Sequence, residues 1–293
     1  MITAIIIVLI ACAIILGALI VSQIIKQRVS FNAGDQALGF GIGMLTDFLD
    51  TLGVGSFVTT TTLFQWTNYL DDKRNLPGTM YMGHAIPTVV EALFFVTAVN
   101  VEITTLISMV LAAVIGSLIG SEVVVRLNQA MIQKIMATAL VATAILMAIN
   151  KMGLISIIAV HNNAVGLTGG ALVIGIIGNF ILGMLMSAGV GLYAPCMVLV
   201  YFLGLKPIAA FPIMMLSCAI LMPVTSVNFM RSNRYSLKGI IGFIFGGIVG
   251  VVIAATLVKG LSIEMLGWLI VAISFWTAYQ LWRSAKVTEK IIK

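Results

Sequence analysis

Four ionisable side chains lie inside long apolar stretches of this sequence, and they are the residues best suited to chemistry. Asp47 and Asp50 are three positions apart and would share one face of a helix. His84 and Glu91 are seven positions apart and would also share a face. Ionisable groups in apolar helices are costly and mark functional sites by default. Because desolvation and a nearby like charge both favour a protonated carboxyl, we interpret all four residues as candidates for proton coupling.

Each of these residues also has a structural alternative. The carboxylate of Asp50 could cap a helix that begins after the glycines that follow it. Asp47 and Glu91 could make satisfied polar contacts in a helix bundle. A functional role is favoured for Asp50 and Glu91, because a carboxylate in an apolar medium is so expensive.

Two apolar stretches, 37–69 and 169–203, are too long for one membrane crossing, and a Gly-Val-Gly triplet interrupts each near its middle. A helix that restarts inside a membrane presents free N–H groups and a partial positive charge, which suits an anion. We expect a substrate site where the two breaks meet. Its candidate residues are Gly53, Gly55, Ser56 and Thr59 from the first half, and Gly189, Gly191 and Cys196, with Pro195 shaping the break, from the second. Alternatively, the glycines only permit close helix packing and the threonines bond the preceding turn.

The elements that must position these residues are membrane helices. Of the 293 residues, 61% are hydrophobic and 9% are charged, and the mean hydropathy is +1.16, whereas soluble domains carry about 25% charged residues. The net charge of +6 comes from basic residues between apolar runs, which indicates topology signals and lipid partners instead of nucleic acid. The first apolar run has no basic residues before it and exceeds a signal-peptide core, so we expect a retained transmembrane helix.

The positive-inside rule distinguishes two topologies for the long segments. If both are re-entrant hairpins, thirteen Lys and Arg residues are cytoplasmic and three are outside. If both segments cross the membrane, the count becomes ten to six. The hairpin topology is favoured, with the N-terminus outside and the C-terminus in the cytoplasm, although glycine-broken helices can also span.

The two halves of the chain resemble each other. An offset of 136 residues aligns the two Gly-Val-Gly triplets and also Pro87 with Pro223, and an offset of 130 aligns Gly116 with Gly246. Such duplications are frequent in transporters. We therefore predict an all-α polytopic membrane protein with two inverted repeats, each opened by a glycine-broken helix. The predicted regions are 1–36 (an extra N-terminal helix and loop), 37–150 (first repeat), 151–168 (connection), 169–282 (second repeat) and 283–293 (cytoplasmic tail).

Several chemistries find no support in the sequence. There is no GxxxxGK[ST] nucleotide-binding loop and no HExxH metal motif, and two histidines are few for acid–base catalysis. We expect neither an enzyme nor a cofactor. Cys12, Cys196 and Cys218 have no metal-type spacing, and we interpret them as packing residues. Methionines and Cys218 gather around Pro223, which is consistent with core packing or with a pathway for a soft metal ion.

The text around the breaks resembles the TauE/SafE family, also called the 4-toluene sulfonate uptake permease family. The segments DTLGVGSF, GHAIPTVVEAL, GVGLYAPCM and AFPIMMLSCAILMPV are similar to a branch common in low-GC Gram-positive bacteria. The resemblance covers about residues 37 to 282. It implies transport of small, often sulfur-containing anions such as sulfite or sulfonates, with the substrate at the two breaks. Ser56 and Leu192 depart from the family's glycine triplets, which bears on substrate identity more than on fold.

These observations together lead to an expected function. We expect a secondary transporter that moves a small, sulfur-containing anion across the bacterial cytoplasmic membrane by alternating access, coupled to protons. The partners would be the anion, protons and membrane lipid. Two alternatives stay open: a transporter of soft-metal cations, and a membrane assembly or sensor protein that carries no flux.

Overall fold

The computed structural model describes most of the chain. The described residues are 2–52, 55–95, 101–154, 163–189, 191–206, 209–257, 268, 271–272, 275–276, 278–279, 281–283 and 285–286. Across them the chain is helical, and its one β-type contact is an isolated bridge between Ala164 and Leu205. The sequence prediction of an all-α protein is confirmed for this part of the chain.

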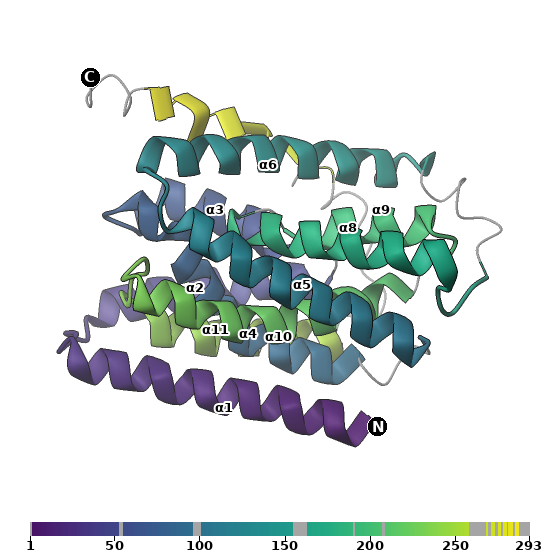
Figure 1. Cartoon of the computed structure of the whole chain (residues 1–293). Coiled ribbons are helices and arrows are strands. Elements are labelled where there is room, and N and C mark those ends of the chain that lie inside the picture. The colour runs from purple at the N-terminus through teal and green to yellow at the C-terminus, as the bar shows by residue number, and fades with distance from the viewer. Residues whose placement is uncertain are drawn as a thin grey trace.

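The long helices lie side by side, with α1 along one edge of the bundle and α6 near the opposite edge (Figure 1). The helices are α1 (Ile2–Lys26), α2 (Ala33–Thr51), α3 (Ser56–Trp66), η1 (Lys73–Asn75), α4 (Leu76–Phe95), α5 (Ile103–Val124), α6 (Gln129–Lys151), α8 (Gly169–Ser187), α9 (Tyr193–Phe202), α10 (Ala210–Arg231) and α11 (Ile240–Leu257).

Five of the described helices are long and apolar enough to cross a membrane. They cover Thr3–Lys26, Ile103–Val124, Gln129–Leu146, Gly169–Ser187 and Phe211–Arg231. The length of each matches the roughly 20 residues that a bilayer core requires. This pattern is that of a polytopic helical membrane protein.

The surface of α5 shows which solvent the bundle suits. Large aliphatic side chains recur every fourth residue along one face and are about half exposed: Ile103, Ile107, Leu111, Ile115, Ile119 and Val123. Polar side chains such as Thr60, His84 and Ser117 are instead fully buried. An apolar exterior around a polar interior is stable when the surrounding medium is lipid.

Glycines allow two helix pairs to approach backbone to backbone. A Cβ on Gly43 of α2 would meet the carbonyl group of Phe243 in α11, and a Cβ on Gly250 of α11 would meet the carbonyl of Met44. The second pair, α5 and α8, packs in the same way, because a Cβ on Gly116 would meet the carbonyl of Phe180. Without a hydrophobic driving force in lipid, small residues at such contacts supply much of the association energy.

The α2–α3 segment begins and ends at the same end of the bundle. Near its beginning, the side-chain oxygen of Gln36 accepts a hydrogen bond of 2.8 Å from the N–H of Gly242. Just after its end, the hydroxyl of Tyr69 donates a hydrogen bond of 2.6 Å to the carbonyl of Lys238. Lys238 lies just before α11 and Gly242 lies in its first turn, so the chain enters the bundle along α2 and returns along α3.

The α8–α9 segment also returns to its starting end, and this end is the opposite one. Ala164, before α8, pairs with Leu205, after α9, and the N–H of Lys206 donates to the carbonyl of Ala164 at 2.9 Å. The N–H of Glu102 donates to the carbonyl of Val165 at 2.7 Å, which places these residues at the start of α5. The far end of α5 lies beside the last turn of α10, where Nδ2 of Asn228 donates to the hydroxyl of Ser121. Figure 1 shows α3 and α9 toward opposite ends of the bundle.

Candidate functional site

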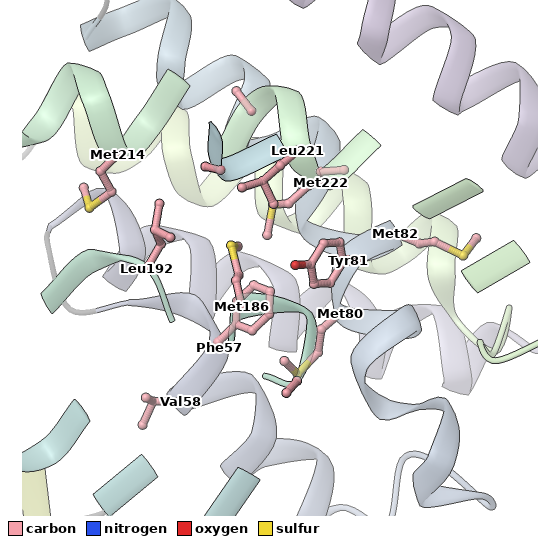
Figure 2. Close-up of a cluster of buried hydrophobic side chains, with 14 of the residues drawn as sticks. Phe57, Val58, Met80, Tyr81, Met82, Met186, Leu192, Met214, Leu221 and Met222 are labelled. Atoms are coloured by element: carbon pink, nitrogen blue, oxygen red, sulfur yellow. The ribbon is translucent and has the colours of Figure 1, made fainter. Parts of the chain in front are cut away.

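Both chain breaks meet at one small cavity inside the bundle. Its volume is about 30 Å³, enough for one or two water molecules. Figure 2 shows the side chains of Phe57, Met186 and Met222 converging there from α3, α8 and α10. The lining residues are Asp50, Gly55, Ser56, Phe57, Thr88, Glu91, Met186, Gly191, Leu192, Met214, Met215, Cys218 and Met222.

The carboxylate of Asp50 binds the start of α3. The N–H of Ser56 donates to Oδ1 of Asp50 at 3.0 Å, and the Ser56 hydroxyl donates to Oδ2 at 2.7 Å. A carboxylate at a helix N-terminus satisfies free amide groups and complements the helix dipole. The capping alternative for Asp50 is therefore confirmed, and Asp50 lines the cavity as well.

Glu91 and Thr88 bring unpaired polar atoms to the same cavity. Each is only 3% exposed, and Oε1 of Glu91 and Oγ1 of Thr88 have no hydrogen-bond partner. Burying such an atom without a partner costs about 1–3 kcal/mol. The unpaired oxygens indicate that the cavity accommodates a further polar group.

Asp47 and His84 lie behind the cavity instead of in its wall. Oδ1 of Asp47 is 2.8 Å from Nδ1 of His84, and Nε2 of His84 is 2.8 Å from the hydroxyl of Thr60. Asp47, His84 and Thr60 are each at most 1% exposed. This hydrogen-bonded chain joins α2, α4 and α3, and both Asp47 and His84 are close enough to Asp50 to interact electrostatically with it.

The remaining predicted substrate residues have other surroundings. The hydroxyl of Thr59 donates to the carbonyls of Gly55 and Ser56, as the helix-bonding alternative predicted. A Cβ on Gly189 would meet the side chain of Met136, away from the cavity. Cys196 is completely buried, and neither it nor Pro195 is among the cavity residues. Gly53 lies outside the described residues.

The two glycines that reach the cavity differ in backbone conformation. Gly55 has φ of +86° and ψ of +121°, which side-chain-bearing residues rarely adopt. Gly191 is not among the glycines of positive φ, and a Cβ there would meet only the Cβ of Phe57 at 3.9 Å.

This difference gives a stability prediction. Gly55→Ala is expected to cost about 1–3 kcal/mol of stability because alanine is strained at that φ, whereas Gly191→Ala is expected to stay within about 0.5 kcal/mol of the parent protein. Thermal unfolding of the two purified variants in the same detergent measures the difference. Equal melting temperatures would show that the chain break does not require glycine at position 55.

A sulfur-rich wall faces the carboxyl groups across the cavity. It is formed by the side chains of Met186, Met214, Met215, Cys218 and Met222. The Cys218 thiol and the Met186 sulfur are 3.9 Å apart. Among the described residues, no group of three or more His, Cys, Asp or Glu side chains is arranged to hold a metal ion.

Sequence reasoning missed three residues of the cavity, Phe57, Thr88 and Met186. Thr88 follows His84 by four positions and precedes Glu91 by three, so helical spacing alone would have placed it on their face. Met186 stands 136 positions after Asp50, which is the offset that relates the two breaks.

The carboxyl and imidazole groups of the site come from one half of the chain only. The positions 136 residues after Asp47, Asp50, His84 and Glu91 are all uncharged: Gly183, Met186, Ile220 and Val227. The two halves therefore contribute different side chains to the cavity, and its carboxyl groups come from α2 and α4.

The site and the bundle define the class of this molecule as a helical membrane protein with a buried cavity, lined mainly by apolar side chains and by a few polar ones. Comparison with protein-family models, with curated proteins and with solved structures finds no match.

Proposed function

We propose that this protein is a secondary transporter that moves a small anion across the bacterial cytoplasmic membrane, coupled to protons. The observation that carries the proposal is that both chain breaks, represented by Gly55 and Gly191, meet at a buried cavity that Glu91 also lines with an unpaired carboxyl oxygen, Oε1. Helix starts favour anions, and a carboxyl group beside them binds or releases a proton. The resemblance to the TauE/SafE family favours a sulfur-containing anion.

The packing supports an architecture of two inverted repeats with re-entrant hairpins. The α2–α3 and α8–α9 segments return to opposite ends of the bundle. Their helix pairs correspond: the contact of Gly250 with Met44 repeats that of Gly116 with Phe180, at offsets of 134 and 136 residues. In this packing Gly116 corresponds to Gly250, whereas the 130-residue offset of the glycine pattern had paired it with Gly246. The two correspondences differ by four residues, which is about one helical turn.

The size of the cavity supports the proposal of alternating access. A volume of about 30 Å³ holds one or two waters and is too small for an anion the size of sulfite with its ligands. The bundle must therefore open toward one side to admit the substrate, and the inverted hairpins provide two equivalent ways to open. The end where α2 and α3 meet the Lys238 region carries more basic residues, so we assign it to the cytoplasm.

The test is uptake of labelled sulfite, sulfate, thiosulfate and methanesulfonate into proteoliposomes, with and without a pH gradient. Uptake of one anion, stimulated by the gradient, is expected. Gly191→Leu should reduce it by about tenfold or more, because a leucine fills the cavity at a cost of about 1–3 kcal/mol. Gly170→Leu is the matched control, since a Cβ at that position on α8 contacts nothing. No uptake of any anion by folded protein would refute the proposal.

A second candidate function is transport of a soft-metal cation, favoured by the sulfur wall that includes Met186, Cys218 and Met222. Thioether and thiolate sulfur select ions such as Cu(I). The same liposomes, loaded with a Cu(I)-chelating dye, distinguish the two. Copper uptake that is lost in Cys218→Ser with Met222→Leu, without any anion flux, would replace the anion proposal with this one.

A further inference from the structure

Asp50 occupies the place where an anion would bind at the start of α3. Two donors of that helix start, the N–H and the hydroxyl of Ser56, are both used by the Asp50 carboxylate, at 3.0 and 2.7 Å. Charge-assisted hydrogen bonds of this kind are roughly twice as strong as neutral ones. A substrate anion can use the same donors only after this carboxylate has left them.

The second break carries no corresponding carboxylate. The residue at the position equivalent to Asp50 is Met186, which lines the same cavity with an uncharged thioether. The two helix starts therefore differ in one respect: that of α3 is supplied with its own internal anion, and that of α9 is not.

A second feature shows that the cavity is built for a ligand. Oε1 of Glu91 and Oγ1 of Thr88 are unpaired, 97% of each residue's surface is buried, and both residues line the cavity beside Asp50. A buried hydroxyl and one unpaired carboxyl oxygen can bind a polar molecule that enters this space.

We propose that Asp50 is a tethered competitor of the transported anion and is displaced from Ser56 when it takes up a proton. This inference rests on the proposed anion transport. Ionised Asp50 holds the Ser56 donors; protonated Asp50 loses the charge that held it there, and the anion takes its place. One proton enters with each anion, and both leave when Asp50 ionises and returns to Ser56, so the exchange is reversible and no other reactant is needed.

The titratable groups that face Asp50 come from three helices. They are Asp47 on α2, His84 and Glu91 on α4, and Cys218 on α10. Helices α3, α8 and α11 contain no Asp, Glu, His, Lys or Arg. All four groups stay in place in the variants below, so a change in the pH response reports on Asp50.

The experiment measures binding of the anion that the uptake assay identifies, with labelled thiosulfate as the first probe, as a function of pH. In the parent protein the affinity should fall about tenfold per pH unit once Asp50 ionises, because one proton accompanies each anion. In Asp50→Asn the affinity should be independent of pH and equal to the parent value at low pH. Asp35→Asn, the same change at the other end of α2, should keep the parent slope.

A measurement on the unaltered protein covers the case in which Asp50→Asn does not fold. Adding the anion at neutral pH to lightly buffered protein should withdraw about one proton per bound anion from solution. It should also increase the protonated-carboxyl band in the infrared difference spectrum. Binding without proton uptake, or a parent pH slope that persists in Asp50→Asn, would overturn this inference while leaving anion transport intact. Absence of anion binding and flux at every pH would overturn the proposed function, and the inference with it.

Discussion

Gly43→Ala is expected to lower the stability of the protein by about 1–3 kcal/mol or more. The new Cβ would meet the carbonyl group of Phe243 and the amide nitrogen of Gly247, which are backbone atoms of α11 and cannot rotate away. The two helices would have to separate along their whole contact, and overpacking of this kind is destabilising even where side chains can adjust. Thermal unfolding in detergent and the monodisperse fraction in size-exclusion chromatography measure the loss.

Gly41→Ala is the matched control on the same helix. A Cβ at Gly41 contacts nothing within 4 Å, so the variant should gain the helix propensity of alanine, about 1 kcal/mol, without a clash. A similar loss is expected for Gly183→Ala, whose Cβ would meet the carbonyl of Ala113 in the second helix pair. If the alanine variants at 41 and 43 melted at the same temperature, the close contact of α2 with α11 would be wrong.

Asp47→Ala is expected to cost about 3–5 kcal/mol. Its carboxylate is bonded to His84 at 2.8 Å, and both side chains are at most 1% exposed. Removing Asp47 leaves Nδ1 of His84 without a partner in a medium that cannot solvate it, while Nε2 keeps its hydrogen bond to Thr60. His84→Ala should cost a similar amount, and the double variant should lose less than the sum of the two single losses, because the shared interaction is removed only once. Chemical or thermal unfolding of the parent protein, the two single variants and the double variant measures these losses.

The pair of Asp72 and Arg74 provides the surface comparison. Its side chains are 33% and 46% exposed, so Asp72→Asn should change stability by only about 0–1 kcal/mol. The hydrogen bonds from Arg74 hold the pKa of Asp72 below its usual range. Any contribution of this pair is therefore present above about pH 4 and is lost as the pH falls through the lowered pKa. A loss of about 3–5 kcal/mol at Asp72 would contradict the exposed position of the Asp72–Arg74 pair.

Helical faces explain how much of the site could be predicted from the sequence. Spacing placed Asp47 with Asp50 and His84 with Glu91, since neighbours on a helix follow from its period alone. The glycine breaks also predicted where chain segments would interrupt their helices, because Gly55 has a backbone conformation that other residues rarely adopt. These properties are local, and local properties can be read along one chain segment.

The division of roles among the ionisable residues required the tertiary structure. Asp50 and Glu91 line the cavity, whereas Asp47 and His84 form a hydrogen-bonded pair behind it. Spacing could not separate them, because neighbours on one helix face can point toward different partner helices. The contribution of Met186 likewise depends on α8 reaching the cavity from the opposite end of the bundle.

The sequence by itself determined the apolar helices, their membrane-compatible lengths, the two breaks and the ionisable residues within the apolar stretches. All of these follow from composition and from the period of a single helix. Only the tertiary structure decided that Ser56 is already bound by Asp50 and that Oε1 of Glu91 is left without a partner in the same cavity. The physical reason is that hydrogen-bond satisfaction inside a bundle depends on which helix faces meet, and those contacts join residues far apart in the chain.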